Sequence, residues 1–316
     1  MTPVEVRTEI LPSGPYRLPG PLPDGTLRRR GDVLVRLLRV DGHDVLLRAA
    51  RARDGRVTLG ARLLGDDAGA GARDPRRAAS EALRRWRFAL AVDQDLRPFL
   101  AAHRDDPLIG PSLRAHPWRR PHRRPSVFEA VLCAVCEQLI AYEDAVAITR
   151  RIAHRHGAST RWAPAGGGDP LALTAPPDAA TVAGRTAPAH LEACGLAPSR
   201  AAALHRAARE LASGRIDEAG DPDRVLLRLG RIPGIGSWTL ALVAAQGLGR
   251  VDRPPSGDLN LRKALGRIRT GDPRARVPED DVDAWLAPYA PWGALAAAHL
   301  MARRPDTLPV TVPTAA

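Results

Sequence analysis

One short turn constrains this chain more than any other feature. The segment 231–237, RIPGIGS, separates two stretches of helical periodicity and is too short for anything but a tight hairpin between helices. Gly234 and Gly236 can take positive φ and allow another backbone to approach closely. The first amides of the second helix then lack partners and lie at the positive end of its dipole. Such a turn binds a phosphate without reading base sequence, although a plain glycine-capped turn is the simpler interpretation of PGIG alone.

Two residues near this hairpin add information. Trp238 opens the second helix, and Asp258 follows the loop DRPPSG, just before the helical run LNLRKALG. Taken alone, Trp238 is most simply a core residue and Asp258 is most simply an N-cap. The dipole of a capped helix favours an ionised carboxylate at its start. Capping and a chemical role are therefore compatible at Asp258.

The first 110 residues predict a mixed α/β domain. Residues 27–62 alternate apolar and polar side chains in short runs, which Asp41-Gly42 and Asp54-Gly55 separate. These dipeptides are typical of two-residue hairpin turns, so we predict at least three antiparallel strands. Helical periodicity follows from about residue 76.

The rest of the chain predicts helices. Residues 111–124 are basic and rich in proline, as in a linker, and Ser126 with Glu129 predicts a capping box. We expect a helical domain over 125–304 with a surface loop over 163–180, and a flexible tail over 305–316. The expected fold is thus mostly α with an N-terminal module that contains an antiparallel sheet. Further helices are predicted at about 188–194, 198–213, 222–229, 237–247, 258–267, 279–286 and 292–303.

Charge and cysteine content limit the class of protein. The net charge is +12, which favours a polyanionic partner, although Lys263 is the only lysine and an arginine-rich composition also fits a high-GC genome. No apolar stretch is long enough for a membrane span and no signal segment is seen, so we expect a cytoplasmic, nucleoid-associated protein. Cys133 and Cys136 fall on one predicted helix, where two small buried side chains are a better interpretation than a metal site.

These segments together resemble the helix-hairpin-helix (HhH-GPD) superfamily of DNA glycosylases, and within it the 3-methyladenine DNA glycosylase II (AlkA-like) branch. The resemblance covers about residues 125–304 and, more weakly, the N-terminal module. PSVFEAVLCAVCEQLIAYEDA is similar to the family's opening helix, and PWGALAAAHLM at 291–301 is similar to its closing segment. The four-cysteine iron–sulfur cluster of other branches is not expected, because no cysteine follows Cys194.

The resemblance implies roles for the hairpin residues. Asp258 matches the catalytic aspartate. Trp238 stands where bifunctional members carry a Schiff-base lysine, so lyase activity is not expected. The hairpin implies main-chain contacts to DNA phosphate, and in some members 231–236 also holds a monovalent cation; no other cofactor is implied. The hairpin residues that match are Pro233, Gly234, Ile235 and Gly236.

The resemblance also implies a wedge and a base pocket. Leu139 matches the side chain that fills the gap left by a flipped nucleotide, with Gln138 beside it; a core leucine next to a polar residue is the alternative. The implied base pocket comprises Trp238, which could stack on a cationic base, together with Leu242 and Met301, which stand where the branch often has aromatic residues. Candidate aromatic replacements, each with a core alternative, are Tyr142, Trp285 and Trp292.

The expected function is that of a monomeric, monofunctional DNA N-glycosylase in base excision repair. It would excise alkylated purines of the 3-methyladenine or 7-methylguanine type from double-stranded DNA by base flipping and Asp-assisted hydrolysis. One alternative is a helix-hairpin-helix DNA-binding protein without catalysis, against which Asp258 argues. Another is a glycosylase for an oxidised, deaminated or mismatched base, which the aliphatic residues Leu242 and Met301 leave open.

Overall fold

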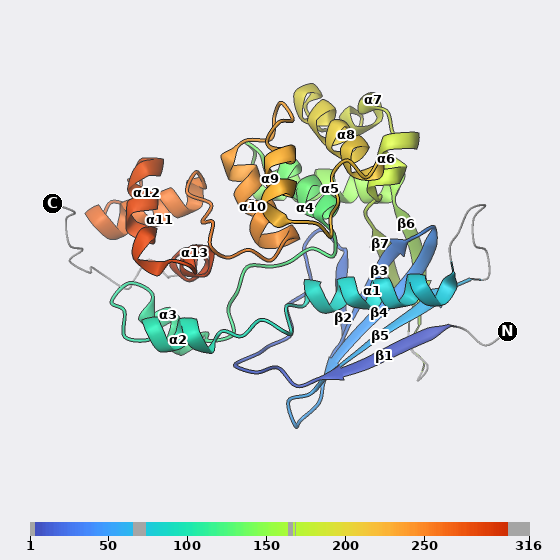
Figure 1. The fold of residues 1–316 in the computed structure, drawn as a ribbon, viewed down its shortest axis with the longest axis horizontal. Coiled ribbons are helices and arrows are strands. Elements are labelled where there is room, and N and C mark those ends of the chain that lie inside the picture. The colour runs from blue at the N-terminus through green and yellow to red at the C-terminus, as the bar shows by residue number, and fades with distance from the viewer. Residues whose placement is uncertain (1–3, 66–73, 164–166, 168, 303–316) are drawn as a thin grey trace.

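The structure, a computed structural model, describes residues 4–65, 74–163, 167 and 169–302. The predicted tail over 305–316 lies outside the described residues, as do the last two residues of the predicted helical domain. Figure 1 shows an N-terminal sheet, a central group of helices above it and a second helical group beside them. The expected fold class, mostly α with an antiparallel sheet in the N-terminal module, is confirmed.

The N-terminal sheet has five antiparallel strands in the order β1-β5-β4-β3-β2. The predicted turn at Asp41-Gly42 joins β3 to β4, and both residues have positive φ, 50° and 83°. The helix α1, Pro75–Ala89, packs its apolar side on one face of the sheet, where Trp86 is buried and its indole donates to the Arg48 carbonyl at 3.1 Å. The strands are β1 Glu5–Ile10, β2 Leu27–Arg30, β3 Val33–Val40, β4 His43–Arg51 and β5 Val57–Leu64.

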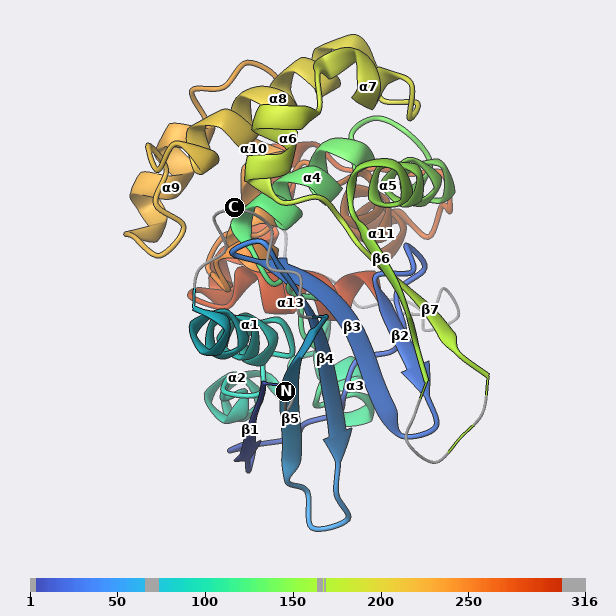
Figure 2. The same ribbon diagram turned by 90° about the vertical axis from the view of Figure 1, so that its right-hand side faces the viewer.

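The prediction of a surface loop over 163–180 is wrong at its C-terminal part. The strand β7, Leu171–Ala175, pairs with β6, Ala158–Trp162, and the helix α6, Ala179–Arg185, begins inside the predicted loop. The reason is packing, because Leu173 and Ala175 are buried against the face of the five-stranded sheet that α1 leaves open. Figure 2 shows α1 and the β6–β7 pair on opposite sides of the sheet.

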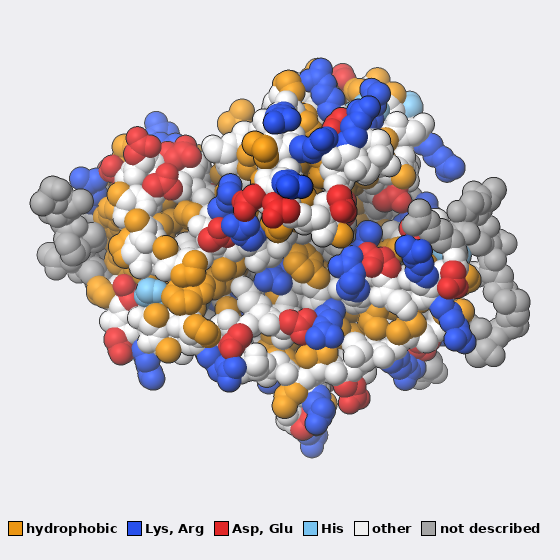
Figure 3. Space-filling view, viewed as in Figure 1, with side chains coloured by type: hydrophobic (Ala, Val, Ile, Leu, Met, Phe, Trp, Pro, Cys, Tyr) orange, Lys and Arg blue, Asp and Glu red, His pale blue; other side chains and the backbone are white. Residues whose placement is uncertain are grey.

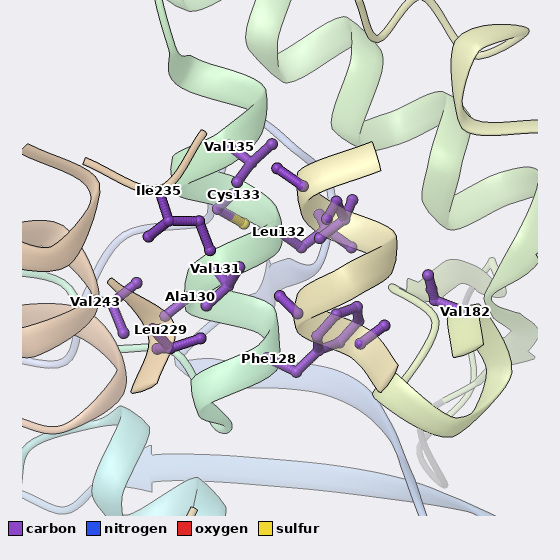
Figure 4. Packing of buried hydrophobic residues seen from close by; sticks show 14 of the residues in the cluster. Phe128, Ala130, Val131, Leu132, Cys133, Val135, Val182, Leu229, Ile235 and Val243 are labelled. Atoms are coloured by element: carbon purple, nitrogen blue, oxygen red, sulfur yellow. The ribbon is translucent and has the colours of Figure 1, made fainter. Parts of the chain in front are cut away.

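The central helical group surrounds α4, Val127–Glu137. Residues 127–136 are all buried, and Figure 4 shows several of their side chains, among them Phe128, Leu132 and Val135, packed against neighbouring helices. The predicted helices of this region are present with ends close to those expected. Around α4 lie α5 Tyr142–His156, α6, α7 Pro188–Glu192, α8 Pro198–Ala212, α9 Pro222–Leu229 and α10 Ser237–Gly247.

A second helical group has its own core. The short helices α2, Arg97–His103, and α3, Gly110–Ala115, come before α4 in the chain. Nevertheless Phe99 and Ile109 from this region pack with Leu265 and Leu295 of the C-terminal helices. Packing thus crosses the domain boundaries that we predict near residues 110 and 125, and the division into domains stays a prediction. None of the described helices is long and apolar enough to span a membrane. The group comprises α2 Arg97–His103, α3 Gly110–Ala115, α11 Leu259–Thr270, α12 Glu279–Leu286, η1 Ala287–Tyr289 and α13 Gly293–Met301.

Buried charges connect the sheet to α4. Arg36 of β3 donates to both carboxylate oxygens of Glu129 at 2.5 Å, and Arg124 pairs with Asp24 at 2.8 Å and approaches Glu129 at 3.5 Å. Although burial favours a neutral acid, Arg124 holds the pKa of Asp24 down at about 2. The capping box is half confirmed: Ser126 accepts from the Glu129 amide at 3.1 Å, but the Glu129 carboxylate pairs with Arg36 instead of turning back.

Candidate active site

Asp258 is the N-cap of α11, as its position before LNLRKALG predicts. Its Oδ1 accepts hydrogen bonds from the amides of Asn260 at 2.8 Å and Leu261 at 3.1 Å. These bonds fix the carboxylate at the positive end of the helix dipole. An ionised carboxylate has about four acceptor positions, so Oδ2 stays available for other groups.

Trp238 reaches this carboxylate from the first turn of α10, the helix that precedes α11 in the chain. Its indole Nε1 donates to Asp258 Oδ2 at 3.2 Å, and both residues are half-buried. Sequence reasoning assigned the two residues to one site, and the structure brings them into direct contact. Three acceptor positions of the Asp258 carboxylate are thereby occupied, which leaves about one on Oδ2 for a water molecule.

The hairpin between α9 and α10 presents backbone to solvent. Gly234 has a φ of 93°, a left-handed conformation that favours glycine, and a Cβ there would meet the Ala203 side chain at 3.1 Å. Gly236 is the N-cap of α10 and supplies no side-chain hydrogen bond to the first turn. The first amides of α10 are therefore without intrahelical partners, as anion binding at a helix start requires.

The four hairpin residues do not all face the same way. Pro233, Gly234 and Gly236 are exposed, whereas Ile235 is buried in the core against α4 (Figure 4). The Ile235 amide donates to the Ile232 carbonyl at 3.0 Å, so neither its side chain nor its N–H is free for a phosphate. Ile235 holds the hairpin in place, and the exposed residues around it form the surface.

Basic side chains border this hairpin. A groove of about 410 Å³ beside Pro233 is lined by arginines of α8, the connection from α8 to α9, α9 itself and the turn after α9. Figure 3 shows basic side chains gathered over α8 and α9 on this face of the molecule. Glu210 pairs with two of the arginines, and the other three make no ion pair among the described residues. The arginines of the groove are Arg206, Arg209, Arg215, Arg228 and Arg231.

The segment after α4 is tied to the hairpin. The Gln138 amide donates to the Gly234 carbonyl and to the Thr239 hydroxyl, each at 2.9 Å, and Arg200 donates to the Gln138 carbonyl at 2.7 Å. Gln138 therefore positions the segment against the hairpin. The next residue, Leu139, is fully exposed and has a φ of 54°. A leucine held in this sparsely populated conformation with its side chain in solvent is typical of a functional position.

The predicted pocket residues are not all brought to this site. Leu242 lies one turn after Trp238 on α10 and is half-buried. Met301 ends α13 with 42% of its surface exposed, and no described hydrogen bond or core cluster joins it to Trp238 or Asp258. Of the candidate aromatic replacements, Trp285 and Trp292 pack on the core of the second helical group, whereas Tyr142 is exposed.

Sequence reasoning missed Glu137, the last residue of α4. Burial raises the pKa of Glu137 and outweighs the opposite effect of the nearby Arg124 guanidinium, while the negative charge of Asp258 raises this pKa further. Among the described residues, the Glu137 carboxyl makes no ion pair and no hydrogen bond. In the sequence Glu137 is only a charged residue beside Gln138 at the end of a predicted helix. The fold alone places it within electrostatic range of Asp258.

The two cysteines of α4 lie inside the core. Burial raises the pKa of Cys136 to about 12 and that of Cys133 well above its ordinary value, so both thiols stay protonated. Among the described residues, no group of three or more histidine, cysteine, aspartate or glutamate side chains could hold a metal ion.

Comparisons with solved structures identify the fold. The chain is similar to the 3-methyladenine DNA glycosylase from Archaeoglobus fulgidus, with 19% identity, a TM-score of 0.69 and 88% of each chain covered. It is also similar to the 8-oxoguanine glycosylase/lyase from Clostridium acetobutylicum in its apo form, with 12% identity and a TM-score of 0.59 over 87% of this chain and 97% of that one. For the same enzyme bound to double-stranded DNA the identity is 13% and the TM-score is 0.60, over 87% of this chain and 96% of that one.

These likenesses define the class of fold. The chain has the fold of the helix-hairpin-helix DNA glycosylases, and the matched length includes most of the N-terminal module as well as the helices. The family resemblance that its sequence motifs carry is thus confirmed at the level of the fold. No protein-family model and no curated protein sequence matches the chain.

Proposed function

We propose that this protein is a DNA N-glycosylase that removes a damaged base by hydrolysis and leaves the DNA backbone intact. The observation that supports this most is the contact between Trp238 and Asp258, 3.2 Å from indole nitrogen to carboxylate oxygen, beside a hairpin with free amides. A DNA-binding hairpin alone has no need of such a carboxylate. The neighbours of this fold that bind DNA are themselves glycosylases.

Residues of the candidate active site can contribute to each step of the proposed reaction. Exposed hairpin amides and neighbouring arginines would hold the phosphates, while Leu139 would fill the gap left by the extruded nucleotide. As the bond at C1′ breaks, positive charge develops on the sugar, and the Asp258 carboxylate stabilises it. The acceptor position that stays open on Oδ2 can hold the attacking water.

The leaving base that fits this site best is an alkylated purine. Methylation at N3 or N7 makes the base cationic, so it departs without a proton donor. The Trp238 ring can stack on that cation, which is worth about 0.5–2 kcal/mol. Leu242, one turn along α10, offers an aliphatic surface beside it.

The side chains present support the proposal of hydrolysis without strand cleavage. A lyase forms an imine between an amine and C1′, and an indole cannot do so. The only lysine of the chain, Lys263, is exposed on α11 and lies in the second turn after Asp258. We therefore propose that abasic DNA is the product.

Glu137 favours a second candidate, a glycosylase for a neutral damaged base such as a deaminated purine. A neutral base leaves more easily when it is protonated, and a carboxyl group with a raised pKa near the reaction centre can act as the donor. Excision of a neutral base would then fall as Glu137 ionises, whereas excision of a cationic base would not.

Mass spectrometry of released bases distinguishes these proposals. Duplex DNA is methylated in one sample and deaminated in another, and each is incubated with the wild type and with the Glu137→Gln variant. Release of methylpurines by both proteins supports the first candidate. Release of a deaminated base by the wild type alone supports the second. Failure to release any base from either DNA contradicts the proposal of a glycosylase.

A further inference from the structure

A second basic site lies apart from the hairpin. A cavity of about 710 Å³ is bounded by segment 17–21, the region around the β2–β3 turn, the end of β4, the end of α1 and residues 118–123. No residue of the hairpin, α10 or α11 lines it. The charged side chains of its wall are six arginines and one aspartate: Arg17, Arg29, Arg51, Arg119, Arg120, Arg123 and Asp32.

These arginines, of which three are half-buried and three are exposed, differ from the buried arginines of the protein. Arg36 and Arg124 are buried and each is paired with a carboxylate. By contrast, none of the six cavity arginines makes an ion pair within the part of the chain that the structure describes. Burial lowers the pKa of Arg119 and Arg120. Burial and the neighbouring Arg120 charge lower the pKa of Arg123 to about 10, against a smaller opposing effect of Asp93. Unpaired charge that is partly removed from water is costly unless something neutralises it.

Some of these guanidinium groups have structural partners. Arg120 donates to the carbonyls of Ala91 and Pro15, and it stacks on a tyrosine ring at 5.2 Å. Arg123 stacks on Phe88 at 5.0 Å. The Nε of Arg119 has no hydrogen-bond partner, and exposed Arg51 stands at the end of β4. Arg29 donates to the Pro19 carbonyl at 2.8 Å and Arg17 stacks on Trp118 at 5.6 Å. The cavity therefore has cationic walls that such contacts hold in place, whereas the guanidinium of Arg51 and the Nε of Arg119 make no hydrogen bond within the described part of the chain.

We propose that this cavity is a binding site for a phosphate-bearing anion with several phosphate groups. Guanidinium groups match phosphate oxygens in a two-pronged geometry, and several of them here converge on one space. The cavity has the size of a typical ligand site, roughly 300–1,000 Å³. Two sources share this chemistry: the backbone of a DNA strand that passes the N-terminal module, and a soluble polyphosphate or nucleotide.

The test uses the whole chain and three probes: inorganic triphosphate, adenosine triphosphate without divalent cations, and an undamaged DNA duplex. The cavity variant is Arg51→Gln/Arg119→Gln. The matched control, Arg62→Gln/Arg185→Gln, removes the same charge from two exposed arginines outside the cavity. Calorimetric titration gives the affinities, and thermal unfolding shows that each variant is folded. None of these measurements depends on glycosylase activity.

If the ligand is a soluble polyphosphate, the cavity variant should bind triphosphate or the nucleotide at least about tenfold more weakly than the wild type, and the control variant less than about twofold more weakly. If the ligand is the DNA backbone, the affinity for the duplex should fall at least about tenfold, and its salt dependence should become shallower by about two phosphate contacts. The unliganded cavity variant should melt at or above the wild-type temperature, because like charges are removed. Equal affinities of the cavity and control variants for all three probes would overturn the proposal.

Discussion

Replacing Leu139 with alanine should separate base excision from folding. The Leu139 side chain is fully exposed, so its loss removes no packing. Alanine keeps the Cβ, so the cost of the left-handed backbone, φ 54°, stays in both proteins. The free energy of unfolding should therefore change by less than about 0.5 kcal/mol.

The effect on excision should be larger. When the base leaves the stack, the wedge side chain enters an apolar gap, and burying a leucine is worth about 1.5–3 kcal/mol. Alanine keeps a small part of that surface, so about 1–2.5 kcal/mol is lost. A loss of this size lowers the excision rate on duplex DNA about 5- to 70-fold. Single-stranded DNA has no stack to open, so its excision rate should change little.

Single-turnover base release from one lesion, placed in duplex and in single-stranded DNA, measures this difference. Leu11→Ala is the matched control, because Leu11 is also an exposed leucine, at 60%, and follows β1 far from the hairpin in sequence. If Leu139→Ala releases the base from duplex DNA as fast as the wild type does, the assignment of Leu139 as the wedge is refuted. Equal losses on both substrates would refute the argument from stacking.

Three other predictions concern stability and chemistry. Arg36→Leu should lower the free energy of unfolding, measured with urea, by about 3–5 kcal/mol, because buried Glu129 loses its closest partner. The control Arg39→Leu breaks the partly exposed pair with Asp44 and should cost far less, so equal losses would contradict this prediction. Glu137→Gln should stabilise the protein at pH 8 and leave its stability unchanged at pH 4. The folded state holds the Glu137 proton more tightly than the unfolded state, so wild-type stability falls as pH rises through the raised pKa. Parallel profiles of stability against pH for the wild type and the variant would argue against this. Borohydride should trap no complex with DNA, because Trp238 cannot form an imine; a trapped complex would show lyase chemistry.

Local signals in the sequence predict the helices well. Helix starts are marked by capping residues, and Ser126 and Asp258 cap α4 and α11 as their side chains indicate. Gly234 and the Asp41-Gly42 turn are equally local, because each requires a left-handed backbone conformation that few residues adopt; Gly236, by contrast, is extended with a φ of -96°. These features need no knowledge of distant residues.

Tertiary packing decides the features that the sequence does not show. The strand β7 follows a region rich in glycine and proline and forms because the open face of the sheet buries Leu173. Glu129 looks like the second half of a capping box, but Arg36, from a strand 93 positions earlier, takes its carboxylate. Likewise the neighbourhood of Glu137 and Asp258 exists only in the folded chain.

The site itself is predicted in its identity but not in its geometry. The motif names Trp238 and Asp258, while the hydrogen bond between them is a property of the fold. Gln138 is predicted as a DNA contact, yet its amide holds the hairpin carbonyl of Gly234. Positions of this kind depend on how two helices meet, which no local pattern in the sequence encodes.

The most direct test of the central claim is base release by Asp258→Asn on methylated duplex DNA. Asparagine caps a helix as well as aspartate does, so folding and DNA affinity should be kept. Asp221→Asn, at the N-cap of α9, controls for the change in capping. We predict that Asp258→Asn loses at least about a hundredfold in rate while Asp221→Asn keeps wild-type activity. Wild-type base release by Asp258→Asn would contradict it.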